Sequence, residues 1–449
     1  MNHIHFISIG GNTMHSIALE LQRKGYHITG SDDEIYNPSY TRLKNAGLLP
    51  DAMGWDPDRI HKGIDAIILG MHARIDNPEL IKAIELSIPV YSYPEFLYRE
   101  SRNKKRVVVA GSHGKTTTTA MVMTGLASAA VDFDYMVGAP LAGFDKLVHL
   151  SDAPLIVMEG DEYLSSPIDR RPKIHHYHPH VAIITGIAWD HINVFKTFDD
   201  YQQQFSIFMT QVESGGHIIY NEEDEVLIAL IQSFNRSDVN LTPYRAVELD
   251  IRKNIMAGSE SYPSSLVGRH NYLNMGAALA CCKVLGIAES IVFQSMSAFQ
   301  GASKRLQVLV NRGDFIAYLD YAHAPSKVTA TVKAIKDWYN GKKVYAILEL
   351  HTYSSLNKDF IPLYRDCFSG IDHAVVFYNE HTIAMKKLSP LNPAEVRTYF
   401  GKGNIQVITR KEDLRQYILD IEKSNCIVLL MSSGHFEGLE VQSLLEVEQ

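Results

Sequence analysis

The tract from Val107 to Thr119 constrains the fold of this chain more than any other feature of the sequence. An apolar strand runs into a tight turn between Gly111 and Gly114, and the run that begins with Lys115-Thr116 favours a helix. A strand, glycine turn and helix in that order present backbone N–H groups and the positive end of a helix dipole to an anion. The tract therefore predicts a parallel α/β sheet that carries a phosphate-binding loop.

Two side chains of this loop suit a nucleoside triphosphate. Lys115 supplies a positive charge for terminal phosphate oxygens, and Thr116 supplies a hydroxyl for the accompanying Mg²⁺. The alternative is a chance lysine behind a glycine turn, which the complete order of strand, turn, Lys-Thr and helix disfavours. The loop is shorter than the usual G-x-x-x-x-G-K-[ST]. The residues expected to contact the nucleotide are Gly111, Ser112, His113, Gly114, Lys115, Thr116 and Thr117.

Length and composition indicate a globular protein of several domains. The chain has 449 residues, of which 46% are hydrophobic and 21% charged, and a net charge of −8 gives no basic footprint for nucleic acid. The four cysteines form no C-x-x-C pair, and Cys281 and Cys282 lie in an apolar helical run, which indicates core thiols in a reducing compartment. Neither a signal peptide nor an apolar run of ~18 residues is present. We expect a cytoplasmic protein that binds neither nucleic acid nor membrane.

Strands and helices alternate almost throughout, which predicts an α/β fold with largely parallel sheets. The alternation favours three domains at 1–102, 103–307 and 308–449: a Rossmann-like domain, a central domain of P-loop ATPase type and a second Rossmann-like domain. The polar stretch Ser101–Arg106 is predicted to be a linker. The predicted strands include 4–9, 26–30, 65–69, 107–110, 155–159, 181–185, 315–319, 343–348, 374–378 and 427–431, and the predicted helices include 14–24, 78–86, 95–100, 272–285, 327–339 and 412–422.

Acidic and histidine residues follow two of the buried strands, where ligands bind in open α/β sheets. Glu159 ends the strand 155–159, and Asp190-His191 follows the strand 181–185. Mg²⁺ prefers hard oxygen ligands, so Glu159 and Thr116 are candidate metal ligands. His191 is a third candidate, although imidazole is unusual for Mg²⁺ and His191 could act through water. The alternative is that these strand ends are solvated.

Three further segments carry weaker signals. The turn Gly10-Gly11 lies between the first strand and first helix, and Asp32 follows about 20 residues later, as in a dinucleotide fold, but G-x-G-x-x-G is not satisfied and an ordinary turn would look similar. In the tract His175–His180 an extended backbone would place His176, His178 and His180 on one face, but Pro179 favours a surface or substrate-lining loop over a zinc site. Asp320 and His323 precede Pro325 and predict a nucleotide contact or a hinge. The spacing of these residues is equally compatible with the capped start of a helix.

These segments together resemble the Mur ligases, ATP-dependent amide-forming enzymes of bacterial cell-wall synthesis, over nearly the whole chain and in family order. Gly111-Ser-His-Gly-Lys-Thr-Thr-Thr is similar to the ATP loop G-T-H-G-K-T-T-T of that family, and Glu159-Gly-Asp-Glu162 is similar to its metal-binding E-A-D-E. His270-Asn271-Tyr-Leu-Asn274 resembles its adenine-binding H-N-x-x-N box. The resemblance also extends to Asp190-His191, Arg305, Asp320-Tyr-Ala-His323-Ala-Pro325 and the turn Gly10–Met14.

The resemblance implies residue roles that the spacing alone does not give. Lys115, His191 and Arg305 would be catalytic, with His191 also serving the metal beside Thr116 and Glu159. ATP would be held by the phosphate loop together with His270, Asn271, Asn274, Arg305, Asp320 and His323. The UDP-sugar and acceptor would be bound by Gly10, Gly11, Asn12, Met14, Ser31, Asp32, His72, Asp161, Glu162, Arg170 and Arg171.

Asp161-Glu-Tyr163, the stretch Ile168–Lys173 and the ending Met431–Gly438 are similar to the murein tripeptide ligases. That branch implies joining of UDP-N-acetylmuramate to L-alanyl-γ-D-glutamyl-meso-diaminopimelate through an acyl phosphate, in peptidoglycan recycling, with ATP and Mg²⁺ as cofactors. The muramate–L-alanine ligase of peptidoglycan synthesis is the near alternative. We expect a monomer or weak homodimer.

The chain departs from the family pattern at two points: Ser8 replaces a glycine of the first turn, and Leu350-His351 stands where an arginine-containing acceptor motif is expected. No lysine occurs from Tyr201 to Phe208, which agrees with the muramate-specific branch. Folate polyglutamate synthases lack the first domain, and a non-enzymatic nucleotide switch does not need Lys115, Thr116, Glu159 and His191 together. Both of these rival classes are therefore disfavoured.

Overall fold

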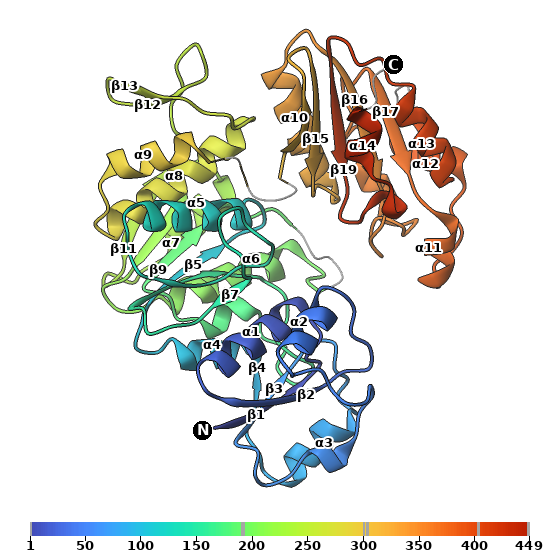
Figure 1. The fold of residues 1–449 in the computed structure, drawn as a ribbon. Helices are drawn as coiled ribbons and strands as arrows, with labels where there is room; N and C mark the ends of the chain where they lie inside the picture. The colour runs from blue at the N-terminus through green and yellow to red at the C-terminus, as the bar shows by residue number, and fades with distance from the viewer. Residues whose placement is uncertain (1, 190–193, 300, 302–304, 402–404, 447–449) are drawn as a thin grey trace. The chain divides into compact units, whose positions relative to one another are not determined.

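The computed structural model describes residues 2–189, 194–299, 301, 305–401 and 405–446. The chain forms two compact units, one of Met1–Ser264 with Leu273–Phe299 and the other of Ser265–Tyr272 with Gln300–Gln449. The first unit contains two largely parallel sheets and the second contains one (Figure 1). This confirms the predicted α/β class. The three predicted domain ranges stay a prediction.

The amino-terminal sheet has four parallel strands in the order β2-β1-β3-β4. Apolar side chains of β1, β3 and α3 form a buried cluster on one of its faces. Helix α3 begins sharply because the side chain of Asn77 accepts hydrogen bonds from the N–H groups of Glu79 and Leu80, and Pro78 occupies the first helical position. The elements are β1 (His3–Ile7), α1 (Asn12–Arg23), β2 (His27–Ser31), α2 (Ser39–Asn45), β3 (Ala66–Leu69), α3 (Pro78–Glu85), β4 (Val90–Ser92) and α4 (Tyr93–Glu100).

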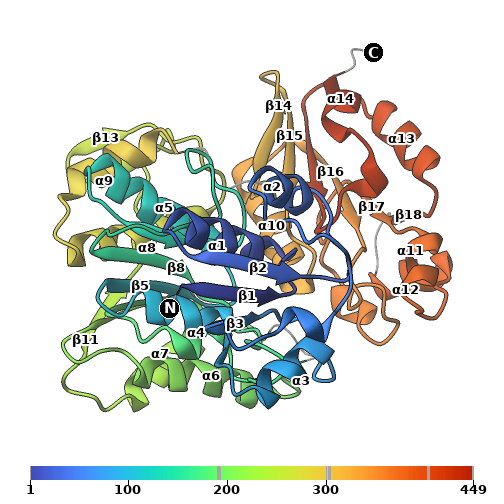
Figure 2. The same cartoon turned by 60° about the horizontal axis from the view of Figure 1, so that its bottom comes forward.

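The central sheet has seven strands in the order β11-β10-β9-β5-β8-β6-β7, all parallel to their neighbours except the pair β6–β7. Helices α5, α8 and α9 lie on one face, and α6 and α7 lie on the other (Figure 2). Covering both faces explains why β9, β8 up to Met158 and β5 from Val107 onward are apolar. The strands are β5 (Lys105–Ala110), β6 (Asp134–Met136), β7 (Val148–His149), β8 (Leu155–Glu159), β9 (Val181–Ile184), β10 (His217–Asn221) and β11 (Asn240–Tyr244).

The helices of this part of the chain are α5 (Lys115–Ser128), α6 (Phe198–Thr210), α7 (Glu225–Ser233), α8 (Arg269–Val284) and α9 (Glu289–Ser297). A small antiparallel hairpin of β12 (Ile255–Ala257) and β13 (Glu260–Tyr262) precedes α8. Cys281 and Cys282 are fully buried on α8, which confirms the core thiols.

The sheet of the second unit has the strand order β14-β15-β19-β16-β17-β18, parallel except for the pair β14–β15. Helices α10, α11 and α12 pack on one face, and α13 and α14 pack on the other. The elements are β14 (Gln307–Asn311), β15 (Phe315–Asp320), α10 (Pro325–Trp338), β16 (Lys343–Glu349), β17 (His373–Phe377), α11 (Glu380–Met385), α12 (Pro393–Tyr399), β18 (Ile405–Ile408), α13 (Lys411–Leu419), β19 (Cys426–Met431) and α14 (Val441–Glu446).

The predicted linker Ser101–Arg106 is wrong at its end, because Lys105 and Arg106 begin strand β5. The Arg106 side chain is buried and donates to the carbonyl oxygens of Ser101, Tyr177 and His178 and to the carboxylate of Glu213. A guanidinium with five donors satisfies several carbonyl groups at once, so a residue that looks like part of a charged linker is an internal brace.

Candidate active site

The phosphate loop has the geometry that the sequence predicts. It leaves the end of β5, and its last residue, Gly114, is the N-cap of α5 with a φ of 80°. Gly111 also has a positive φ, of 125°. A Cβ atom at Gly111 would lie 2.2 Å from Thr185 Oγ1, and one at Gly114 would lie 2.3 Å from Asn274 Oδ1. Both glycines are therefore required by backbone conformation and by close packing.

Contacts from the neighbouring strands and helices fix the loop in place. The Ser112 N–H donates to the Gly186 carbonyl at 3.0 Å, and the Ser112 hydroxyl lies 2.8 Å from the Tyr201 hydroxyl. Thr185 donates to the His113 carbonyl at 2.5 Å. Roles for Tyr201 and Thr185 are not predictable from the sequence, since neither residue belongs to a local motif. For Thr185, the one sequence signal was its position directly after the buried strand β9.

Lys115 is held inside the loop by two acceptors. Its Nζ donates to the Gly111 carbonyl and to Glu162 Oε2, each at 2.8 Å. Glu162 is 1% exposed and also accepts a hydrogen bond from the Tyr201 hydroxyl at 3.1 Å. Burial alone would lower the pKa of Lys115, but the carboxylates of Glu162 and Asp161 outweigh that effect and raise its pKa. The ammonium group is therefore a stable charge next to the loop.

Thr116 and Glu159 meet as predicted. The Thr116 hydroxyl donates to Glu159 Oε1 at 2.7 Å, and the Gly138 N–H donates to Glu159 Oε2 at 3.0 Å. Burial raises the pKa of Glu159, and the nearby carboxylate of Asp161 raises it further. The Glu159 carboxylate and the Thr116 hydroxyl together offer two hard oxygen donors, which suit Mg²⁺. A cation there would also neutralise the buried negative charge of Glu159. The third candidate ligand, His191, lies outside the described residues, as does Asp190.

The segment after β8 continues away from the phosphate loop. Asp161 pairs with Lys173 at 3.3 Å, and the Lys173 ammonium lies over the rings of Tyr93 and Tyr163. Arg171 is exposed and pairs with Asp169, and Arg170 is exposed. Glu162 is therefore the predicted substrate residue of this segment that contacts the phosphate loop, through its ion pair with Lys115.

The amino-terminal turn is organised around Asp32. Its Oδ2 accepts a hydrogen bond from the Gly10 N–H at 2.7 Å, and the N–H groups of Ser8 and Ile9 both donate to the Ser31 carbonyl. Ser8 takes the left-handed conformation, with a φ of 69°, at the position of the missing glycine. Ser31 donates to the buried Glu79. Gly10 and Asp32 are thus in contact at the turn.

The other predicted residues of this turn differ in exposure. Met14 is buried on α1, Asn12 is exposed at its first turn, and Gly11 accepts a hydrogen bond from His15 at 2.9 Å. His72 is exposed, shortly after β3.

The candidate residues of the second unit cluster at the end of β15. The Asp320 carboxylate accepts hydrogen bonds from the N–H groups of Leu306 and Ala322 at 2.7 and 2.8 Å. The Arg305 guanidinium lies over the Tyr321 ring at 5.0 Å. His323 lies on the same loop, where its Nδ1 is 2.8 Å from the Tyr321 carbonyl. Asp320 therefore organises this loop, a role that sequence spacing left open.

The H-N-x-x-N box occupies the first turns of α8. His270 is exposed, and Asn271 donates to the Val267 carbonyl at 2.8 Å. Within the first unit, Asn274 lies beside Gly114 of the phosphate loop. The box therefore begins in one compact unit and ends in the other.

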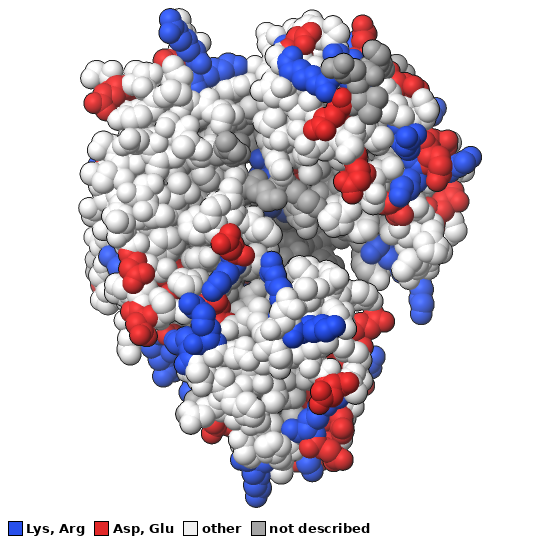
Figure 3. All heavy atoms as spheres, in the orientation of Figure 1, with Lys and Arg blue, Asp and Glu red and all other residues white. Residues whose placement is uncertain are grey.

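Charged residues do not gather by sign on the face shown in Figure 3, where Lys and Arg are scattered among Asp, Glu and uncharged residues. Within the described residues, none of the helices combines the length and apolar character that crossing a bilayer requires.

The fold and the loop define a class: a multi-sheet α/β protein with a phosphate-binding loop on its central sheet. The chain belongs to the Mur ligase family, ATP-dependent ligases of peptidoglycan synthesis. Family profiles match in order: "Mur ligase family, catalytic domain" at residues 3–105, "Mur ligase middle domain" at 109–282 and "Mur ligase, glutamate ligase domain" at 304–434.

Three known proteins illustrate the similarity. A UDP-N-acetylmuramate–L-alanine ligase of Sulfurihydrogenibium sp. is 28% identical, covering 97% of this chain and 96% of that protein. A UDP-N-acetylmuramate–L-alanyl-γ-D-glutamyl-meso-2,6-diaminoheptandioate ligase of Haemophilus influenzae is 27% identical over 78% of this chain and 80% of its own. The crystal structure of a murein peptide ligase from Psychrobacter arcticus shares the fold, with a TM-score of 0.68, 23% identity and complete coverage of both chains.

Proposed function

We propose that this enzyme uses ATP to join the lactyl carboxylate of UDP-N-acetylmuramate to the amino group of L-alanyl-γ-D-glutamyl-meso-diaminopimelate. The main support for ATP-dependent chemistry is the contact between Thr116 and Glu159, next to a phosphate loop that also holds Lys115 in place. The stretch Asp161–Lys173 supports the tripeptide acceptor through its resemblance to murein tripeptide ligases.

The second candidate function is UDP-N-acetylmuramate–L-alanine ligation. It is favoured by the relative from Sulfurihydrogenibium, which carries that name and is similar along almost its whole length. The acceptor loop has His351 where the family resemblance implies an arginine, so neither acceptor follows from a complete motif.

ATP phosphates bind against the N–H groups of the phosphate loop and the amino end of α5. Lys115 keeps its contacts with Gly111 and Glu162 and directs its third N–H donor to the terminal phosphate, because an ammonium group has three donors. Thr116 and Glu159 would hold Mg²⁺, which would neutralise charge on the phosphates. By the family resemblance, His270, Asn271, Asn274, Asp320 and His323 would contact ATP, and Arg305 would meet its phosphates.

The chemistry activates a carboxylate, which by itself is a poor electrophile. A lactyl carboxylate oxygen attacks the γ-phosphorus of ATP, the bond to the β-phosphate oxygen breaks, and ADP leaves. The acceptor amine then attacks the carbonyl carbon of the acyl phosphate, loses a proton, and displaces inorganic phosphate to leave the amide. Lys115 and Arg305 stabilise the transferred charge, so the protein acts mainly by positioning and electrostatics.

The UDP-sugar binds at the turn of the amino-terminal sheet. Gly10 forms the turn through its contact with Asp32, and Gly11 and Asn12 present backbone N–H groups at the start of α1, where an anionic diphosphate is favoured. Asp32 accepts a hydrogen bond from the nucleotide, in the way that an acidic residue at this position of a dinucleotide fold contacts ribose. Met14, Ser31 and His72 complete this part of the site.

Release of inorganic phosphate tests both functions. Purified enzyme, ATP, Mg²⁺ and UDP-N-acetylmuramate are combined with L-alanine, with L-alanyl-γ-D-glutamate, or with the tripeptide, and the products are identified by mass. The proposal expects phosphate and an amide product with the tripeptide. Product with L-alanine alone would establish the second function, and phosphate release without UDP-N-acetylmuramate would reject both.

A further inference from the structure

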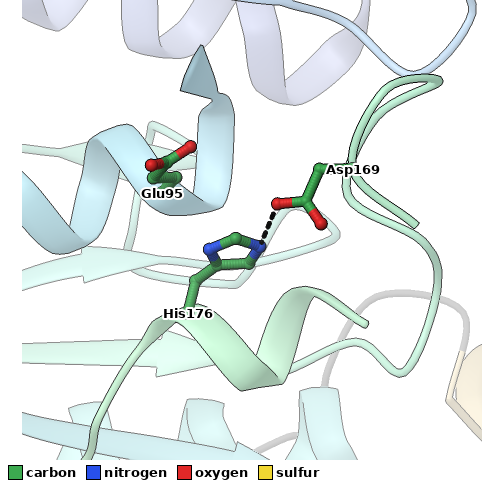
Figure 4. A group of neighbouring side chains, drawn as sticks. All are labelled: Glu95, Asp169 and His176. Atoms are coloured by element: carbon green, nitrogen blue, oxygen red, sulfur yellow. Dashed lines mark ion pairs between the residues drawn. The ribbon is translucent and has the colours of Figure 1, made fainter. Parts of the chain in front are cut away.

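Three metal-binding side chains meet at the junction of α4 with the loop that follows β8. They are Glu95 on α4, Asp169 on the loop, and His176 at the end of the short 3-10 helix Lys173–His176. One potential ligand atom of each lies within 4.8 Å of the others (Figure 4). Among the described residues, no other three His, Cys, Asp or Glu side chains bring potential ligand atoms this close together.

His176 has an unsatisfied nitrogen in this group. Its side chain is 4% exposed, and its Nε2 is buried without a hydrogen bond, although it lies 3.2 Å from Asp169 Oδ2. A buried polar atom without a partner requires an explanation, and a missing ion is one of the recognised explanations. A cation between the nitrogen and the carboxylate would satisfy both lone-pair donors.

The surroundings orient the donors and leave room for another ligand. Arg171 donates to both oxygens of Asp169, at 2.9 and 2.7 Å, and fixes the plane of that carboxylate. A cavity of about 160 Å³ lies beside Glu95 and His176. A water molecule fits there as a fourth ligand, because a zinc site with three protein ligands keeps one open position.

We propose that Glu95, Asp169 and His176 bind a divalent transition-metal cation of the zinc type. One imidazole nitrogen and two carboxylate oxygens suit zinc rather than Mg²⁺, which prefers oxygen ligands alone. Ligand bonds of about 2.0–2.2 Å place neighbouring ligand atoms of a tetrahedral site about 3.4 Å apart, close to the 3.2 Å between His176 Nε2 and Asp169 Oδ2. The site is separate from Thr116 and Glu159 and belongs to different side chains.

Such an ion would join α4 of the amino-terminal sheet to the loop that carries Asp161 and Glu162. Three arginines, Arg99, Arg102 and Arg171, line the same cavity, so an oxyanion is the rival occupant. The cation is favoured because Arg171 is already paired with Asp169 and Arg99 donates to the Tyr91 hydroxyl, whereas the His176 nitrogen has no hydrogen bond.

Zinc chloride titration tests the site without nucleotide, so that no ATP-dependent Mg²⁺ site contributes. The metal-free full-length enzyme competes with a chromophoric chelator for zinc. We expect one zinc per chain, with affinity at least tenfold weaker in the variants His176→Gln and Glu95→Gln. His178→Gln is the matched control, because His178 lines the same cavity but is outside the group. Its affinity should equal that of the wild type.

Thermal unfolding provides the second measurement. Zinc should raise the melting temperature of the wild type and of His178→Gln, but not of the other two variants, and EDTA should reverse the shift. Circular dichroism checks that each variant is folded. If the variant of the buried His176 does not fold, Glu95→Gln alone tests the site. The proposal fails if the wild type binds no zinc, if the variants bind it equally, or if inorganic phosphate rather than zinc stabilises the wild type.

Discussion

At the scale of single residues, the ion pair between Lys115 and Glu162 links the phosphate loop to the segment after β8. Both side chains are removed from water, so neither charge is tolerated without the other. The Lys-Thr pair was predictable from its place after a strand and a glycine turn. Its partner Glu162 was identifiable as an acidic strand-end residue, but a sequence pattern does not show which cation it faces.

Replacing Lys115 with methionine should affect both catalysis and stability. Loss of the charge at the terminal phosphate is expected to lower kcat by about 10²–10³-fold. Loss of the partner of Glu162 should lower the free energy of unfolding by about 3–5 kcal/mol, because a buried carboxylate is left unpaired. Phosphate release and denaturant unfolding measure the two effects.

The double variant Lys115→Met/Glu162→Gln separates those effects. It removes both charges, so most of the lost stability should return while turnover stays low. Recovery of turnover together with stability would show that Lys115 acts through folding and not on ATP.

Asp32 should make binding of the UDP-sugar depend on pH. Burial raises the pKa of Asp32 to about 6, and neighbouring Asp33 contributes to the rise. The carboxylate is charged at pH 8 and takes up a proton as the pH falls through 6, when it loses acceptor strength. Affinity for UDP-N-acetylmuramate should therefore be full above pH 7 and about tenfold weaker at pH 5.

Isothermal titration calorimetry across this pH range gives the measurement. Asp32→Asn should bind more weakly than the wild type at pH 8, with no change between pH 8 and 5. A wild-type affinity that stays constant over the same interval would argue against a role for Asp32 in binding.

At the scale of elements, the sequence specified the strand–loop–helix unit of β5 and α5 well, because apolar periodicity and glycine positions are local signals. It did not specify Arg106, whose charge suggested a linker while its partners lie far along the chain. The tract His175–His180 was ambiguous for the same reason. Residues Lys173–His176 form a 3-10 helix rather than a strand, and His176 meets carboxylates from other elements.

The phosphate loop should tolerate no side chain at either glycine. Gly111→Ala and Gly114→Ala place a Cβ atom within 2.2–2.3 Å of a neighbouring side chain at a positive φ. We expect a loss of about 1–3 kcal/mol from backbone strain alone, and loss of ATP binding because the N–H groups are displaced. Fluorescent nucleotide titration and thermal unfolding report the two changes.

Gly143→Ala is the matched control for that experiment. Gly143 also has a positive φ, of 83°, but a Cβ atom there would meet nothing within 4 Å. It should show the conformational cost and keep ATP binding. Equal nucleotide affinity in all three variants would contradict the assigned role of the loop.

At the scale of the whole molecule, the alternation of strands and helices was enough to predict three largely parallel sheets. Strand order was not predictable, since it depends on crossover connections and not on local pattern. Short elements such as β6, β7 and the hairpin β12–β13 were missed because a strand of two or three residues carries almost no periodicity. The positions of the side chains that hold Ser112 and Lys115 in place were likewise determined by tertiary packing.

We expect the chain to be a monomer or a weak homodimer, and its net charge bears on that prediction. The charge of −8 opposes association of identical chains, and this repulsion weakens as salt screens it. Sedimentation equilibrium at low micromolar concentration should therefore give the chain mass of 50.5 kDa at low ionic strength. Any dimer should increase as sodium chloride is raised to about 0.5 M, where the Debye length falls to about 4 Å. A dimer that persists at nanomolar concentration and low salt would mean that a specific apolar interface outweighs the charge, and the monomeric assignment would then be wrong.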